Sequence, residues 1–174
     1  MPSIITDTFD YNDIIRVLDQ DEAFVHHQVD DLQPKYFRIM QKAKTKGMKV
    51  FAPVTVKGNR GIDYLIYMVS RDWLTTKKQH MLDYMYFGVY RQTDGFHLVG
   101  FLYLDSNPLA NAEKCFFIPH FFDRYRERTG LPLDMPKMDV IKDWISKNQH
   151  LNSDVQGNEK YPDTLLGIVL KNKG

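Results

Sequence analysis

The fold is decided by the stretch MLDYMYFGVYRQTDGFHLVGFLYL, which occupies residues 81–104. Two runs rich in Tyr, Phe, Val and Leu lie on either side of the turn residues Gln92-Thr93-Asp94-Gly95. An Asp-Gly pair tolerates the positive φ that a tight turn requires, and runs of this composition on both sides of it are typical of strands. The stretch therefore predicts a β-hairpin with strands at residues 81–90 and 96–104.

Further strands are predicted around this hairpin. Residues 48–56 and 62–70 are rich in Val, Ile, Tyr and Phe, and the loop KGNRG at residues 57–61 separates them as in a second hairpin. Residues 114–118 predict a fifth strand, and residues 164–170 have the composition of a terminal strand.

Helices are predicted before the strands. Asp10 has the character of an N-cap for a first helix, and Pro34 fits the first turn of a second helix that ends near Lys46, before Gly47. Helical spacing gives each helix an apolar stripe, formed by Ile14, Ile15, Leu18 and Val25 in the first and by Tyr36, Phe37, Met40 and Ala43 in the second.

Two more helices are predicted after the strands. Pro119 begins a helix that reaches about Thr129 and is closed by Gly130, and Asp134 caps the next one. Phe121, Phe122 and Tyr125 face the sheet from the first of these helices, together with Ile118. The second has an apolar face made of Met138, Ile141, Trp144 and Ile145.

The strands are grouped and do not alternate with helices, which favours an α+β fold with a mainly antiparallel sheet of about five strands and helices before and after it. The 174 residues fit a single domain, residues 1–174, in which the polar segment 148–163 is expected to be mobile. A mean hydropathy of −0.43 and the lack of an apolar run near 18 residues exclude a transmembrane helix.

Cysteine usage and the N-terminal residues indicate the compartment. The single cysteine, Cys115, cannot form an intrachain disulfide and is expected to be a small buried hydrophobe. The N-terminal residues do not combine a basic start with an apolar stretch, as a secretory signal does. Together these features favour the reducing cytoplasm. The lack of a long apolar run predicts that the protein has no membrane partner.

Several site signatures are missing from the sequence. It contains no phosphate-binding GxxxxGK[ST] or GxGxxG loop, no HExxH or paired CxxC metal motif, and no GxSxG nucleophile elbow. His26 and Asp30 have a spacing that could place them on one metal, but a solvated acidic helix face explains them better. The sequence therefore predicts no metal site and no cofactor.

Charge is divided sharply along the first third of the chain. Residues 1–34 contain eight acidic residues and one basic residue, whereas residues 35–60 contain eight basic residues and no acidic one. The two segments could pack together and neutralise each other, or the second could form a basic face for a polyanion. The candidate contacts with nucleic acid or an acidic protein are Lys42, Lys44, Lys46, Lys49, Lys57 and Arg60.

Aromatic side chains on the strands could add base stacking to such a face, if they are exposed. They are Tyr64, Tyr67, Tyr84, Tyr86 and Tyr90. Most strand aromatics belong to a core, which is the alternative for each of them.

A second constellation lies on the helix predicted from Pro119. His120, Arg124 and Arg128 follow one another at intervals of four residues; His120 and Arg124 lie on the side opposite the aromatic residues, and Arg128 lies beside them at its boundary. Two guanidinium groups can hold a phosphate, and a histidine that titrates near neutrality can move a proton. The alternative is an amphipathic helix whose exposed arginines pair with Asp123 and Glu127.

The run PHFFDRYRERTG at residues 119–130 resembles a signature of small bacterial and phage-associated proteins with an H-x3-R-x3-R helix. At the level of this motif it is similar to the His/Arg helices of ribonuclease toxins in the barnase–EndoU–colicin–RelE grouping. The resemblance implies a general acid/base role for His120 and phosphate contacts for Arg124 and Arg128. Those folds place their helices before the sheet, whereas residues 119–129 follow the predicted strands.

Three functional hypotheses follow from the sequence. The first is a metal-independent nuclease or phosphoester-handling protein that uses His120, Arg124 and Arg128. The second is a non-catalytic module that binds nucleic acid or an acidic protein through the basic segment 35–60. The third is a protein without a site of its own that works through a partner or an oligomer, and the sequence does not specify an oligomeric state.

Overall fold

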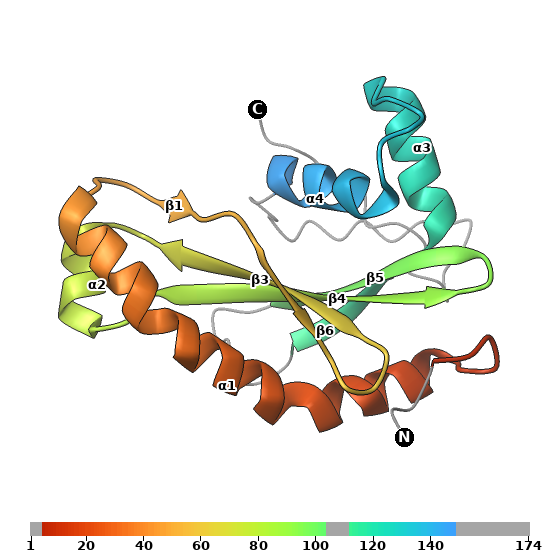
Figure 1. Cartoon of the computed structure of the whole chain (residues 1–174), viewed down its shortest axis with the longest axis horizontal. Coiled ribbons are helices and arrows are strands. Elements are labelled where there is room, and N and C mark those ends of the chain that lie inside the picture. The colour runs from red at the N-terminus through yellow and green to blue at the C-terminus, as the bar shows by residue number, and fades with distance from the viewer. Residues whose placement is uncertain (1–4, 104–111, 149–174) are drawn as a thin grey trace. The chain divides into compact units, whose positions relative to one another are not determined.

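A computed structural model of the chain describes residues 5–103 and 112–148 (Figure 1). A long helix precedes a six-stranded, mainly antiparallel sheet, and two helices follow it, so the predicted α+β class is confirmed. The strand order is β1-β3-β4-β5-β6, and β2 pairs with β3 beside β1. The predicted strand at 164–170 and residues 149–163 of the predicted mobile segment lie outside the described residues. No described helix is long and apolar enough to cross a membrane.

The chain divides into two compact units, Met1–Val89 and Tyr90–Gly174, here called unit 1 and unit 2. Strand β4 (Asp83–Gln92) crosses the boundary between them. Whether the two units fold as a single domain stays a prediction.

Unit 1 is built on one helix where the sequence predicted two. Helix α1 (Tyr11–Ala43) begins at the predicted N-cap, Asp10, whose side chain accepts a hydrogen bond from the backbone of Asp13. The helix then continues through Pro34, so the prediction of a second helix beginning at Pro34 is wrong (Figure 1). At 33 residues α1 is about 50 Å long.

Packing explains why α1 is not interrupted at Pro34. Pro34 lies on the exposed side, where water can reach the carbonyl group that loses its helical N–H partner. On the opposite side, Val29, Tyr36 and Met40 are buried, and Gln33 is bonded to the chain just before β4. These contacts before and after Pro34 keep the chain helical on both sides of it, although proline by itself favours the first turn of a helix.

The strands of unit 1 include the hairpin predicted from residues 48–56 and 62–70. Strands β1 (Lys49–Val50) and β2 (Val54–Lys57) pair with β3 (Asp63–Ser70), and β3 pairs with β4, all antiparallel. A side chain at Gly58 would place its Cβ 2.2 Å from the carbonyl oxygen of Ile62, so only glycine fits this turn. The predicted strand 48–56 is interrupted at residues 51–53, which separate β1 from β2.

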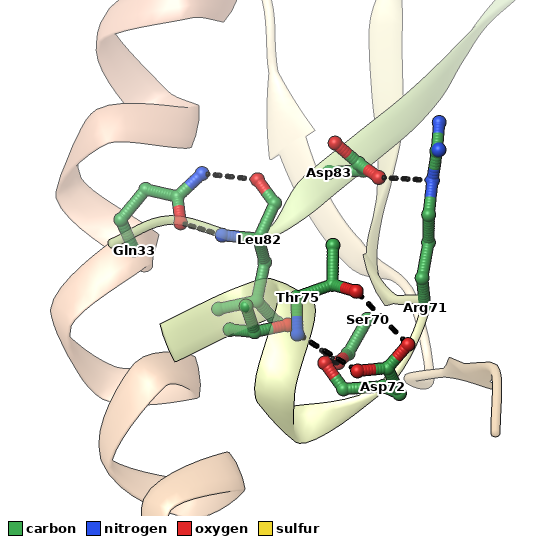
Figure 2. A network of polar contacts seen from close by, with 8 residues as sticks. Gln33, Ser70, Arg71, Asp72, Thr75, Leu82 and Asp83 are labelled. Atoms are coloured by element: carbon green, nitrogen blue, oxygen red, sulfur yellow. Dashed lines mark hydrogen bonds and ion pairs between the residues drawn. The ribbon is translucent and has the colours of Figure 1, made fainter. Parts of the chain in front are cut away.

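Helix α2 (Trp73–Gln79) was not predicted from the sequence. Asp72 caps it by accepting hydrogen bonds from the backbone and the hydroxyl group of Thr75, and these bonds hold the pKa of Asp72 below its ordinary value (Figure 2). Figure 2 also shows how Gln33 of α1 bonds both the N–H and the carbonyl group of Leu82, each at 2.9 Å. These contacts fix the segment that joins β3 to β4.

Unit 2 contains β5 (Gly95–Tyr103), β6 (Ala112–Phe117), α3 (Pro119–Thr129) and α4 (Lys137–Lys147). Both helices contact β5, and α3 ends as predicted at Gly130, which has a positive φ of 67°. Cys115 is buried, as predicted. The start of α4 was predicted wrongly at Asp134, because Pro136 disfavours helical conformation at Met135 and α4 begins only after it.

The core of unit 2 is an aromatic cluster between β6, α3 and α4. Phe117 lies 4.7 Å from Trp144 between ring centroids, and Phe122 is completely buried beside both. Phe121 and Tyr125, which were also expected to face the core, are only half-buried. Phe122 is therefore the principal side chain that α3 contributes to the core.

Tyr125 has a polar role at the contact between α3 and α4. Its hydroxyl group donates a hydrogen bond to Asp143 at 2.7 Å, and Lys147 donates another at 2.9 Å. Desolvation opposes ionisation of Asp143, but the hydrogen bonds from Lys147 and Tyr125 outweigh it and lower the pKa of this carboxyl group. Burial and the bond to Asp143 raise the pKa of Tyr125.

We expect Asp143→Asn to weaken the acid sensitivity of unfolding. A carboxyl group with a lowered pKa in the folded state stabilises the fold above its unfolded pKa, near 4, and this contribution is lost as the pH falls through the folded value. At pH 7 the substitution should cost about 1 kcal/mol, since Asp143 is partly exposed. Urea unfolding from pH 7 to pH 2 measures both effects, and an unchanged pH slope would contradict the assignment.

Candidate functional site

Exposed lysines gather where α1 ends and α2 lies. Lys42 is in the last turn of α1, Lys44 is its C-cap with a left-handed φ of 48°, and Lys46 and Lys49 follow in the next few residues. Helix α2 contacts α1 and adds Lys77 and Lys78 in its own last turn. Figure 1 shows α2 beside the C-terminal end of α1. We call these six residues the basic end: Lys42, Lys44, Lys46, Lys49, Lys77 and Lys78.

Backbone and ring contacts join the two parts of the basic end. The backbone N–H group of Trp73, the first residue of α2, donates a hydrogen bond to the carbonyl group of Thr45 at 3.1 Å. The rings of Trp73 and Phe37 lie 5.6 Å apart between centroids. Since Thr45 lies between Lys44 and Lys46, these contacts place α2 next to the lysines that follow α1.

The charges of the basic end are not neutralised within the described part of the chain. All six lysines are exposed, and none forms an ion pair with a described residue. Two of the three acids between residues 35 and 83 are engaged elsewhere, since Asp72 caps α2 and Asp83 pairs with Arg71 at 3.0 Å (Figure 2). The third, Asp63, lies opposite Lys57 in the register of β2 and β3.

Lys57 and Arg60 do not belong to the basic end, although the sequence grouped them with its lysines. Lys57 ends β2, and Arg60 lies in the turn between β2 and β3. Arg60 donates to Asp21 at 2.5 Å, and Asp21 is about 30 Å along α1 from Lys42. The structure thus separates the six predicted residues into two groups.

Asp21 is a buried carboxylate with two partners from the hairpin. Only 1% of Asp21 is exposed, and the hydroxyl group of Tyr64 donates to its second oxygen at 2.7 Å. Desolvation and the neighbouring carboxylate raise the pKa of Tyr64 well above its ordinary value. Arg60 therefore has a structural role that attaches the hairpin to α1.

Among the described residues, the ion pair of Arg60 with Asp21 joins the basic segment 35–60 to the acidic segment 1–34. Residues 11–43 form one continuous helix, so the part of the basic segment on α1, residues 35–43, cannot fold back onto the acidic part of the same helix. The division of charge therefore persists along α1 in the folded chain.

The strand tyrosines are mostly unavailable for base stacking. Tyr64, Tyr67 and Tyr90 are buried, and burial raises the pKa of Tyr67 to about 12. Tyr84 is exposed, and its ring stacks on that of Tyr86 at 6.3 Å. The core interpretation therefore holds for three of the five.

The residues of the His/Arg motif lie exposed along α3. Arg124 donates to Glu127 at 2.9 Å, whereas His120 and Arg128 have no hydrogen bond or ion pair with a described residue. Asp123 pairs with Lys137, not with an arginine of α3. The neighbouring Arg126 donates to the carbonyl groups of Leu133 and Met135 and so fixes the α3–α4 loop.

A buried histidine near the start of α3 was not predicted. His97 of β5 is bonded to Asp94 in the hairpin turn, with 2.7 Å between Nε2 and the carboxylate, and its ring stacks on Tyr90 at 4.9 Å. A Cβ at Gly95 would lie 3.2 Å from Pro119, so this turn adjoins the first residue of α3. The spacing of Asp94 and His97 across a turn was the available sequence signal.

The described residues contain no group of three or more His, Cys, Asp or Glu side chains arranged to hold a metal ion. His26 has its ring edge against Tyr84, with 6.1 Å between centroids. Its neighbour His27 lies 3.6 Å from Asp31 on an exposed face.

Comparisons with protein families, curated proteins and solved structures found no match for the chain. The resemblance of residues 119–130 to ribonuclease-toxin helices stays a prediction.

Proposed function

We propose that the protein is a non-catalytic module that binds nucleic acid through the basic end. The observation that carries this proposal is the gathering of six exposed lysines from α1, α2 and the segment between them, without an ion-pair partner in the described residues. Lysine side chains act as mobile point charges that contact phosphate groups without reading base sequence. The proposed binding is therefore electrostatic and tolerant of sequence.

Salt dependence is the signature of such binding. Each phosphate that a lysine neutralises releases condensed counterions, so affinity falls as the salt concentration rises. The acidic half of α1 disfavours contact along the rest of the helix and directs a polyanion to the basic end.

We expect glutamine substitutions at Lys42, Lys46, Lys77 and Lys78 to lower affinity on the order of 10²-fold at 50 mM salt and to reduce the log–log salt slope by about 3. Fluorescence anisotropy with a 15-nucleotide single strand and a 15-base-pair duplex measures both quantities. A control with the same change in charge elsewhere carries glutamine at Arg16, Lys57, Arg124 and Arg128 and should bind almost normally. Equal losses in both variants, or no binding at low salt, would overturn the proposal.

The same samples test the catalytic alternative on α3. Labelled RNA is incubated with the protein in EDTA, which silences metal-dependent contaminants. Intact RNA supports a binding module. Cleavage that falls on the order of 10²–10⁴-fold in His120→Ala, with thermal stability unchanged, would replace it with the nuclease hypothesis.

A further inference from the structure

We propose that the basic end takes single-stranded nucleic acid and that the ring of Trp73 stacks on an unpaired base. This inference rests on the proposed function and specifies its ligand. Trp73 is half-buried at the start of α2, and its indole ring is supported by Phe37 of α1. It is thus a partly accessible aromatic residue next to the lysines of the basic end.

Two contacts of Trp73, together with the cap of α2, hold this residue in position. Its backbone N–H group donates a hydrogen bond to the carbonyl group of Thr45, and its ring packs on Phe37. The preceding residue, Asp72, caps α2 by accepting a hydrogen bond from the backbone of Thr75. A ring that is already held in place loses little conformational entropy when a base stacks on it.

Lysines lie close to Trp73 in two segments of the chain. Lys44 and Lys46 are the chain neighbours of Thr45, whose carbonyl group accepts a hydrogen bond from the backbone N–H of Trp73. Lys77 lies one helical turn beyond Trp73 on α2. A strand can therefore place successive phosphate groups near lysines on both sides while a base between them reaches the indole ring. This combination of cationic groups and an aromatic ring is characteristic of single-strand binding, since duplex bases are already stacked on one another.

Exposed aliphatic side chains at the same end of unit 1 raise the alternative of an anionic membrane surface. Ile39, Met48, Leu74 and Met81 are all exposed. They come from four separate segments, and α2 has only seven residues, whereas interfacial helices bury one continuous apolar face. The arrangement favours nucleic acid, and vesicles enter the experiment as a competing ligand.

The experiment compares three 15-nucleotide ligands by anisotropy at low salt: oligo-dT, an abasic strand of equal charge, and a duplex. Trp73→Ala should lower affinity for oligo-dT by about 5- to 150-fold and affinity for the abasic strand by less than about twofold. Trp73→Phe keeps a ring for packing and stacking and should restore most of the affinity. Leu74→Ala, the neighbouring exposed position, is the matched control and should bind as the wild type does.

A second readout guards against a general loss of structure in Trp73→Ala. Oligo-dT should quench the tryptophan fluorescence of the wild type, and this quenching should vanish in Trp73→Phe, where the buried Trp144 is the remaining tryptophan. Quenching that persists in Trp73→Phe would overturn the stacking.

Other outcomes separate the two proposals. Equal affinity for oligo-dT and the abasic strand, or tighter binding to the duplex, would overturn the stacking while the proposed function stands. Binding to phosphatidylserine vesicles without binding to any strand would overturn both.

Discussion

Replacing Phe122 by alanine should destabilise the protein by about 3–5 kcal/mol, as truncation of buried aromatic residues does. Phe122 is completely buried, and its ring lies near those of Phe117, Phe121 and Trp144. The substitution leaves a cavity at the point where α3 and α4 share their core. Because α3 also carries His120 and both arginines of the motif, loosening this helix should disturb that face as well.

Phe121→Ala provides the matched control for Phe122→Ala. The two phenylalanines are adjacent on α3, but Phe121 is only half-buried, so its truncation should cost about half as much. Urea unfolding followed by circular dichroism measures both free energies. A loss below about 1 kcal/mol for Phe122→Ala, or a larger loss for Phe121→Ala, would mean that the orientation of α3 is wrong.

Replacing Arg60 by alanine should destabilise the protein by about 2–3 kcal/mol. The substitution removes the cationic partner of a carboxylate that is 99% buried and leaves Tyr64 as its described donor. Loss of one partner of a fully buried pair costs about 3–5 kcal/mol, and the partial exposure of Arg60 reduces this figure. Affinity for nucleic acid should stay within about twofold, because Arg60 lies outside the basic end.

Lys57→Ala is the control in the same hairpin, and this exposed position should change stability by less than about 0.5 kcal/mol. A double-mutant cycle with Asp21→Asn isolates the coupling, since Arg60→Ala should cost much less once residue 21 is neutral. Equal costs in the two backgrounds would contradict the ion pair. A large loss of affinity in Arg60→Ala, with stability retained, would return Arg60 to the binding surface.

The sequence predicted those elements whose signals are local. The turn at residues 92–95 and the ends of α3 at Pro119 and Gly130 depend on the residues within each element, and the structure contains them. The helix start predicted at Pro34 was wrong because the local preference of proline is opposed by contacts of Gln33 with Leu82, 49 residues away. Helix α2 is only seven residues long, too short for a clear apolar period, although the Asp72–Thr75 spacing was a usable cap signal.

The candidate site could be predicted only in part, for a related reason. A run of basic residues is visible in the sequence, but its neighbours in space are not. Lys77 and Lys78 belong to the basic end because α2 packs on α1. Arg60 does not belong to it because its side chain pairs with Asp21, which lies 39 residues earlier in the chain. Similarly, the apolar period of α3 predicted its inner side, but it does not distinguish Phe122, which is completely buried, from Phe121, which is half-buried.

For the proposed function, the continuous helix α1 has a consequence for how many copies one nucleic-acid strand can accept. With its basic end on the strand, each copy holds its acidic N-terminal half up to about 45 Å farther along the helix. Neighbouring copies on the same strand then present like charges to each other. Successive binding events should become weaker, so the protein should space itself along a long strand at low salt, where this repulsion is least screened.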